Sequence, residues 1–60
     1  MKTWILALFL VWPSTGQEEI VHHFVRADSR SACVDAQYFW RRVYRRDGAE
    51  VRIADCWVKA

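Results

Sequence analysis

The chain has 60 residues, a net charge of +2 and a composition that is 53% hydrophobic. Sixty residues suffice for one small domain, and a domain of this size usually needs a disulfide, a metal or a partner to be stable. The large apolar fraction, which includes four tryptophans, excludes a disordered tail. The small net charge excludes neither a membrane nor a protein partner, so the distribution of the charges is more informative than their sum.

The first sixteen residues have the three parts of a secretory signal peptide. Lys2 precedes an apolar run over residues 4–12, and Pro-Ser-Thr-Gly follows at 13–16. Small side chains occupy the two positions that signal peptidase inspects, and cleavage there would create a new N-terminus. The cleavage-site residues are therefore Ser14, Gly16 and Gln17. We predict a helical signal peptide at 1–16 and a mature domain at 17–60.

Two alternatives to a cleaved signal peptide stay open. The apolar run covers about 15 Å as a helix, roughly half of the ~30 Å hydrocarbon core of a bilayer. An uncleaved anchor in the inner membrane is therefore the less favoured alternative, and a buried core helix is another. The leader and the two cysteines resemble, in general plan, the short exported proteins of bacteria and their phages, a resemblance that assigns no functional residue.

The rest of the chain has the order strand, helix, strand. Residues 19–27 are rich in β-branched and aromatic side chains, and residues 50–59 alternate in polarity. Polar residues at 28–31 can cap a helix that runs to Arg46, and Gly48 suits the left-handed position after its end. We predict an α/β (α+β) mini-domain, a minimal β-α-β unit with one amphipathic helix on a two-stranded parallel sheet.

The helix prediction depends on how the side chains distribute around its axis. At about 100° per residue, one arc is apolar and most of the remainder is basic. The apolar arc contains Ala32, Cys33, Ala36, Phe39, Trp40, Val43 and Tyr44. The arginine stripe contains Arg41, Arg42, Arg45 and Arg46. This stripe is either a solvated helix end favoured by the helix dipole or a binding site for an anionic surface.

The two cysteines, Cys33 and Cys56, are predicted to form a disulfide. The predicted topology places the start of the helix and the end of the second strand at the same end of the sheet. An exported domain with an even number of cysteines is expected to be oxidised. Closing a loop of about 24 residues contributes roughly 3.5 kcal/mol in the chain-entropy model, a large share of the stability of so small a domain.

The predicted bridge also indicates which side chains face away from the helix. If Cys56 points toward the helix, strand alternation turns Val51, Ile53 and Trp57 to the other side. Both faces of the first strand are apolar as well, because Ile20 and Phe24 would point to one face and Val21 and Val25 to the other. One helix covers only one face of a sheet, so we predict an uncovered apolar patch centred on Trp57.

No catalytic or metal-binding motif is present in the sequence. His22 and His23 are adjacent on a strand and point to opposite faces, which predicts one half-buried and one exposed histidine instead of a shared metal. With both cysteines in a bridge, no four-ligand set remains. A domain of about 44 residues leaves little room for a pocket of ~300 Å³. We therefore expect no enzyme activity, no cofactor and no metal.

These observations favour a small periplasmic or secreted protein that acts by contact. The Trp57 patch would anchor an envelope or extracellular protein, or a second copy in a homodimer, and the arginine stripe would orient it. The alternative is a cationic secreted peptide that binds anionic membranes. We expect no nucleic-acid partner, because the domain is predicted to be exported.

Overall fold

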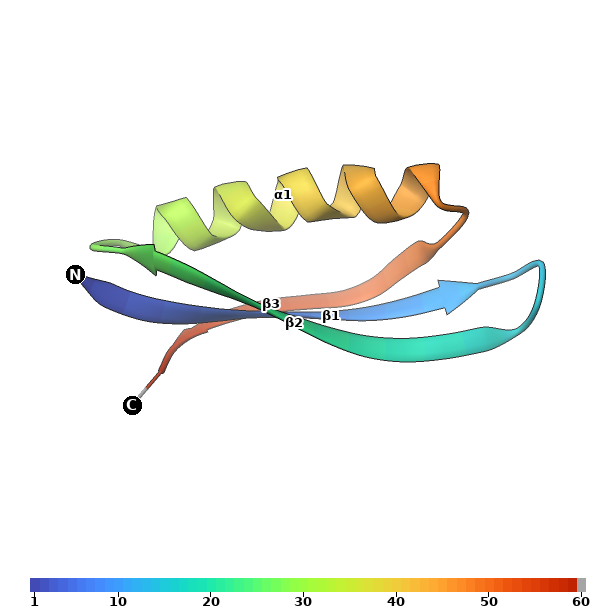
Figure 1. Ribbon diagram of the computed structural model, residues 1–60, viewed down its shortest axis with the longest axis horizontal. Coiled ribbons are helices and arrows are strands. Elements are labelled where there is room, and N and C mark those ends of the chain that lie inside the picture. Colours follow the sequence, from blue (N-terminus) through green and yellow to red (C-terminus); the bar gives the residue numbers. More distant parts are fainter. Residues whose placement is uncertain (60) are drawn as a thin grey trace.

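The computed structural model describes residues 1–59, which form a three-stranded antiparallel sheet and one helix. The elements in chain order are β1 (Lys2–Trp12), β2 (Gln17–Ala27), α1 (Arg30–Arg46) and β3 (Glu50–Val58). β1 lies in the centre, and β2 and β3 each pair with it in antiparallel orientation. The helix lies along one face of the sheet, and no other element covers the opposite face within the described residues (Figure 1).

The prediction of an N-terminal signal helix is wrong, because residues 2–12 form the central strand. A short apolar run has the same composition whether it is the core of a signal peptide or a strand with apolar side chains on both faces. The small residues that suggested a cleavage site form the β1–β2 turn, in which the N–H groups of Thr15 and Gly16 both donate to the Trp12 carbonyl. Gly16 has a φ of 75°, a conformation that favours glycine.

The two-stranded parallel sheet is a second correction. β2 and β3 run in the same direction, as a helical crossover implies, but β1 lies between them. The unit is therefore a split β-α-β, and its two parallel strands share no hydrogen bonds. This second error follows from the first. With residues 2–12 assigned to a signal peptide, no third strand is left to lie between β2 and β3.

Cleavage after Gly16 stays a prediction, and the structure shows what such cleavage would remove. β1 is the strand that joins β2 to β3. Its residues Leu6, Leu8 and Leu10 point toward α1 and are fully buried. The other buried residues are Cys33, Ala49 and Cys56, so half of this small core belongs to β1.

The predicted disulfide is present and joins the first turns of α1 to the end of β3. The Cα atoms of Cys33 and Cys56 lie 6.2 Å apart, within the range of ordinary disulfides. The prediction was right although the strand pairing was wrong. Because β2 and β3 run in the same direction, the helix that follows β2 starts at the end of the sheet where β3 finishes, whether or not a strand lies between them.

The helix prediction is confirmed, with α1 ending at Arg46. Gly48 has a φ of 90°, and its N–H donates to the Arg45 carbonyl, as expected of the left-handed residue after a helix. Two tryptophans on the helix-facing side of β1 form hydrogen bonds to the residues that flank the helix, one at each end of the sheet. The indole N–H of Trp4 donates to the Ala27 carbonyl at 3.2 Å, and that of Trp12 donates to the Asp47 carboxylate at 3.3 Å.

We expect Leu8→Ala to lower the free energy of unfolding by about 2–5 kcal/mol, because it opens a cavity at a fully buried position. Urea denaturation followed by circular dichroism measures the change. Ile20→Ala is the control, since Ile20 is 64% exposed and its truncation should change the free energy of unfolding by less than about 1 kcal/mol. If residues 1–16 were not part of the folded protein, Leu8→Ala would have no effect.

Candidate functional site

The candidate site is the sheet face that α1 does not cover, called the open face below. Strand pairing arranges its side chains in five rows that cross β2, β1 and β3. Lys59 continues β3 by donating its N–H to the Thr3 carbonyl. The rows, from the Thr3 end to the turn end, are Arg26, Thr3 and Lys59; Phe24, Ile5 and Trp57; His22, Ala7 and Asp55; Ile20, Phe9 and Ile53; and Glu18, Val11 and Glu50.

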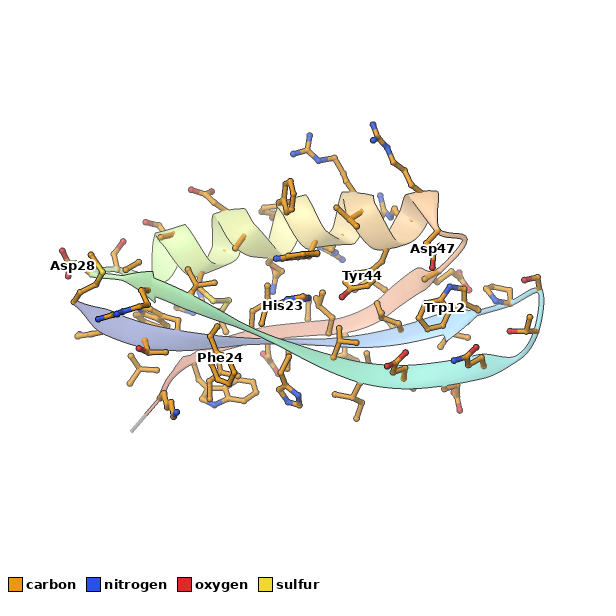
Figure 2. All side chains as sticks on the ribbon, in the orientation of Figure 1. Trp12, His23, Phe24, Asp28, Tyr44 and Asp47 are labelled. Carbon is orange, nitrogen blue, oxygen red and sulfur yellow. A yellow bond between two sulfur atoms is a disulfide. The ribbon has the colours of Figure 1, made fainter. Side chains whose placement is uncertain are left out.

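Four large apolar side chains of the open face are strongly exposed. Phe24 is 65% exposed, Ile20 64%, Ile53 59% and Trp57 43%. Figure 2 shows Phe24 pointing away from the sheet on the side opposite α1. Alternation along β2 and β3 puts these residues outside, because the positions between them face the helix. They surround the half-buried residues of β1 and form one continuous apolar surface.

The centre of the open face is a shallow groove over Ala7, with a volume of about 290 Å³. The small side chain of Ala7 leaves space between the larger residues on either side. His22 contacts Trp57 edge-on, with the ring centroids 6.5 Å apart. At the Thr3 end, the Lys59 ammonium lies 5.4 Å from the Phe24 ring centroid, a cation–π contact. The open face is thus apolar, with polar groups at its edges and in its middle row.

The structure corrects one of the three predicted patch residues. Ile53 and Trp57 lie on the open face, as predicted, but Val51 packs against the core on the helix side. The cause is a β-bulge: Phe9 pairs with Ile53 whereas Leu10 pairs with Val51, so Arg52 is the extra residue. One extra residue reverses the alternation of side chains along the strand, and nothing in the sequence of β3 indicates where it lies.

The arginine stripe lies on α1, on the other side of the molecule from Trp57. Arg42, Arg45 and Arg46 are exposed, and Arg41 is half-buried with its guanidinium 6.0 Å from the Tyr38 ring centroid. Within residues 1–59, none of the four forms an ion pair with a carboxylate. A surface hollow of about 410 Å³ lies among Tyr38, Arg41, Arg42 and Arg45. The structure therefore does not bring the two predicted binding groups together.

A histidine cluster that sequence reasoning missed lies between α1 and β2. The rings of His23 and Trp40 stack, with centroids 3.9 Å apart and an interplanar angle of 8°. His23 Nε2 lies 2.9 Å from the Tyr44 hydroxyl, and Figure 2 shows both side chains between helix and sheet. Burial lowers the pKa of His23. Burial and, to a lesser extent, the Glu19 carboxylate raise the pKa of Tyr44.

The two histidines behave as strand alternation predicts. His23 is half-buried against the helix, and His22 is exposed on the open face. The spacing of Trp40 and Tyr44, one helical turn apart on the apolar arc, was visible in the sequence. Their contact with His23 could not be predicted from the sequence, because it requires β2 to lie under the helix.

Sequence reasoning also missed the middle of the site. Ile5, Ala7, Phe9 and Val11 form the central column of the open face, and all four fall in the segment predicted to be a signal peptide. Within residues 1–59, no three His, Cys, Asp or Glu residues group as metal ligands would. No helix in this part of the chain is long and apolar enough to cross a membrane.

No family model, curated protein or solved structure matches the chain.

We expect the lowered pKa of His23 to make the free energy of unfolding depend on pH. The folded protein favours the neutral imidazole, so stability is greatest above the unfolded-state pKa of 6.5 and declines as the pH falls through the folded-state pKa. His23→Gln should remove this part of the decline. Urea denaturation at about pH 7.5 and about pH 5 measures it in both proteins.

His22→Gln is the matched control for this experiment, because it replaces the neighbouring imidazole on the open face. This variant should show the same decline as the wild type. An equal decline in His23→Gln and the wild type would show that the His23 imidazole does not couple folding to pH.

Proposed function

We propose that the protein acts by contact, binding another protein surface through the open face and catalysing no reaction. The observation that carries this proposal is the cluster of four large apolar side chains, each at least 43% exposed, on one side of a 60-residue chain. Single exposed apolar residues are ordinary, whereas a contiguous patch that includes tryptophan and phenylalanine is typical of an interaction surface.

The layering of the fold supports the same function. An antiparallel sheet with one solvated face normally carries polar residues on that face. Here the three inner rows of the open face contain only two polar residues, His22 and Asp55, both on edge strands. The open face therefore has the composition of a sheet face that a second layer covers. Within the described residues, however, the chain has only one helix, and it lies on the other face. A partner protein would supply the missing layer.

A periplasmic or secreted location belongs to this proposal. A disulfide that links two elements of the core is typical of proteins that fold in an oxidising compartment. An envelope or extracellular protein is then the class of partner to which the open face would have access.

We expect the disulfide-bonded protein to bind Nile red, an uncharged dye whose fluorescence rises on apolar surfaces. Phe24→Ser combined with Ile20→Ser should reduce the fluorescence several-fold, because it removes the two most exposed apolar side chains of the open face. An uncharged dye is chosen because an anionic one would also be attracted to the arginine stripe.

Phe39→Ser combined with Val43→Ser is the matched control. Phe39 is 52% and Val43 38% exposed, and both lie on α1, away from the open face. The control variant should retain most of the dye signal. Absence of dye binding by the wild type at a concentration where it is monomeric, or an equal loss in both variants, would overturn the proposal.

The arginine stripe favours a second candidate function, binding to an anionic membrane surface. Four guanidinium groups lie on one helix without an ion-pair partner among residues 1–59, and Tyr38 stands beside them. Most surface arginines contribute solubility alone, but such a cluster produces a local positive potential that attracts anionic headgroups.

If this second function operates, the protein should bind vesicles of anionic phospholipid at low salt, and binding should weaken as salt is added. Changing the four arginines of the stripe to glutamine should abolish binding in a flotation assay. A control variant removes four cations elsewhere by changing Lys2, Arg26, Arg30 and Arg52 to glutamine. Equal binding by the two variants would show that net charge acts, and not the stripe.

A further inference from the structure

The five rows of the open face have a symmetry about the middle row, which contains His22, Ala7 and Asp55. The rows on either side of it are entirely apolar, with two aromatic residues in one row and one in the other. The outermost rows differ in charge. Arg26 and Lys59 occupy the Thr3 end, and Glu18 and Glu50 occupy the turn end. The face is therefore symmetric in hydrophobicity and antisymmetric in charge.

We propose that the partner of the open face is a second copy of this chain, packed face to face with its strands antiparallel to those of the first copy. This inference rests on the proposed function, since it names the occupant of the same surface. A two-fold axis parallel to both sheets and midway between them, crossing the strand direction over Ala7, relates the two copies. The dimer has a helix layer outside each of two stacked sheets.

The two-fold axis brings unlike rows together. The row of Phe24, Ile5 and Trp57 lies over the row of Ile20, Phe9 and Ile53 of the second copy. The groove over Ala7 lies at the axis, with larger side chains on both sides of it. Stacked sheets pack about 10 Å apart with interdigitated side chains, which is the spacing that one apolar layer from each copy fills.

The charges of the outermost rows favour the antiparallel arrangement over the parallel one. In the antiparallel arrangement Glu18 of each copy lies over Arg26 of the other. Glu50 contributes less, because its carboxylate already pairs with Arg52 at 3.2 Å. If the axis ran along β1 instead, β2 would lie over β3, so Glu18 would meet Glu50 and Arg26 would meet Lys59. The parallel dimer therefore places like charges together at both ends.

The remaining charge in the interface is Asp55, which faces Asp55 of the second copy across the two-fold axis. It lies on the edge strand β3 and is exposed, so both carboxylates stay at the rim in contact with water. The arrangement leaves the apolar rows as the desolvated centre and places the charged groups around it, as in other protein interfaces.

The size of the open face limits the affinity of this dimer. The five rows extend over about nine residues of each strand and cover roughly 27 Å by 14 Å, or about 380 Å² per copy, so the interface is smaller than that of standard specific complexes and has the size of weak, transient ones. We therefore expect a dissociation constant on the order of micromolar, and a dimer that exchanges with monomer.

Sedimentation velocity of the full disulfide-bonded chain, from about 1 to 300 µM, tests the proposal around the expected affinity. The wild type should pass from monomer to dimer over this range. Glu18→Lys and Arg26→Glu should each weaken the dimer about tenfold, because either change turns two attractive pairs into repulsive ones. An equimolar mixture of the two variants should restore dimerisation, since each variant then meets opposite charges at both ends.

Glu19→Lys is the matched control, because it makes the same charge change one residue away on the helix side of β2. It should leave the dissociation constant within about twofold of the wild-type value.

The outcomes separate this inference from the function on which it rests. A wild type that stays monomeric but binds Nile red overturns the dimer and leaves the open face as a site for a different protein. A monomer that binds no dye overturns both. A dimer that Glu18→Lys strengthens has the parallel arrangement, and a dimer that neither charge change affects does not use the open face. Either result contradicts the proposal.

Discussion

The pairing of β1 with both β2 and β3 is the interaction on which the rest of the structure depends. β1 contributes Leu6, Leu8 and Leu10 to the core on the helix side and the central column of the open face on the other. A two-stranded sheet of this size would be marginal, whereas three strands packed against a helix can be stable independently. Without β1, the outer strands would have no common partner and the helix would have little to cover.

The disulfide and the tryptophans hold α1 against one face of this sheet and thereby leave the other free. Cys33 and Cys56 join helix and sheet at one end of the molecule, and Trp12 bonds to Asp47 at the other. His23, Trp40 and Tyr44 fill the space between these attachments. The helix therefore has a defined position along the strands. No second helix from residues 1–59 covers the open face.

The two surfaces with functional potential lie on opposite sides of the molecule and differ in chemistry. The open face is apolar with charges of opposite sign at its ends, and the outer surface of α1 is basic. In the proposed dimer the open faces are buried and both arginine stripes stay outside. Protein contact and membrane contact are thus compatible, because neither requires the surface that the other uses.

The sequence by itself determined the elements whose signals are local. These are the extent of α1, its end at Gly48, the two outer strands, the alternation of His22 and His23, and the cysteine pair, which depends only on the common direction of β2 and β3. Only the tertiary structure decided the conformation of residues 2–12, because a short apolar run followed by Pro-Ser-Thr-Gly has the same composition in a helical leader and in a central strand with its turn. The tertiary structure also decided the side to which Val51 points, because a bulge at Arg52 reverses the alternation of side chains and no sequence pattern in β3 predicts it. The composition of the open face depends on both features, because β1 supplies its central column and the bulge in β3 determines which side chains lie along one edge. Register is a property of paired strands and cannot be read from either strand alone.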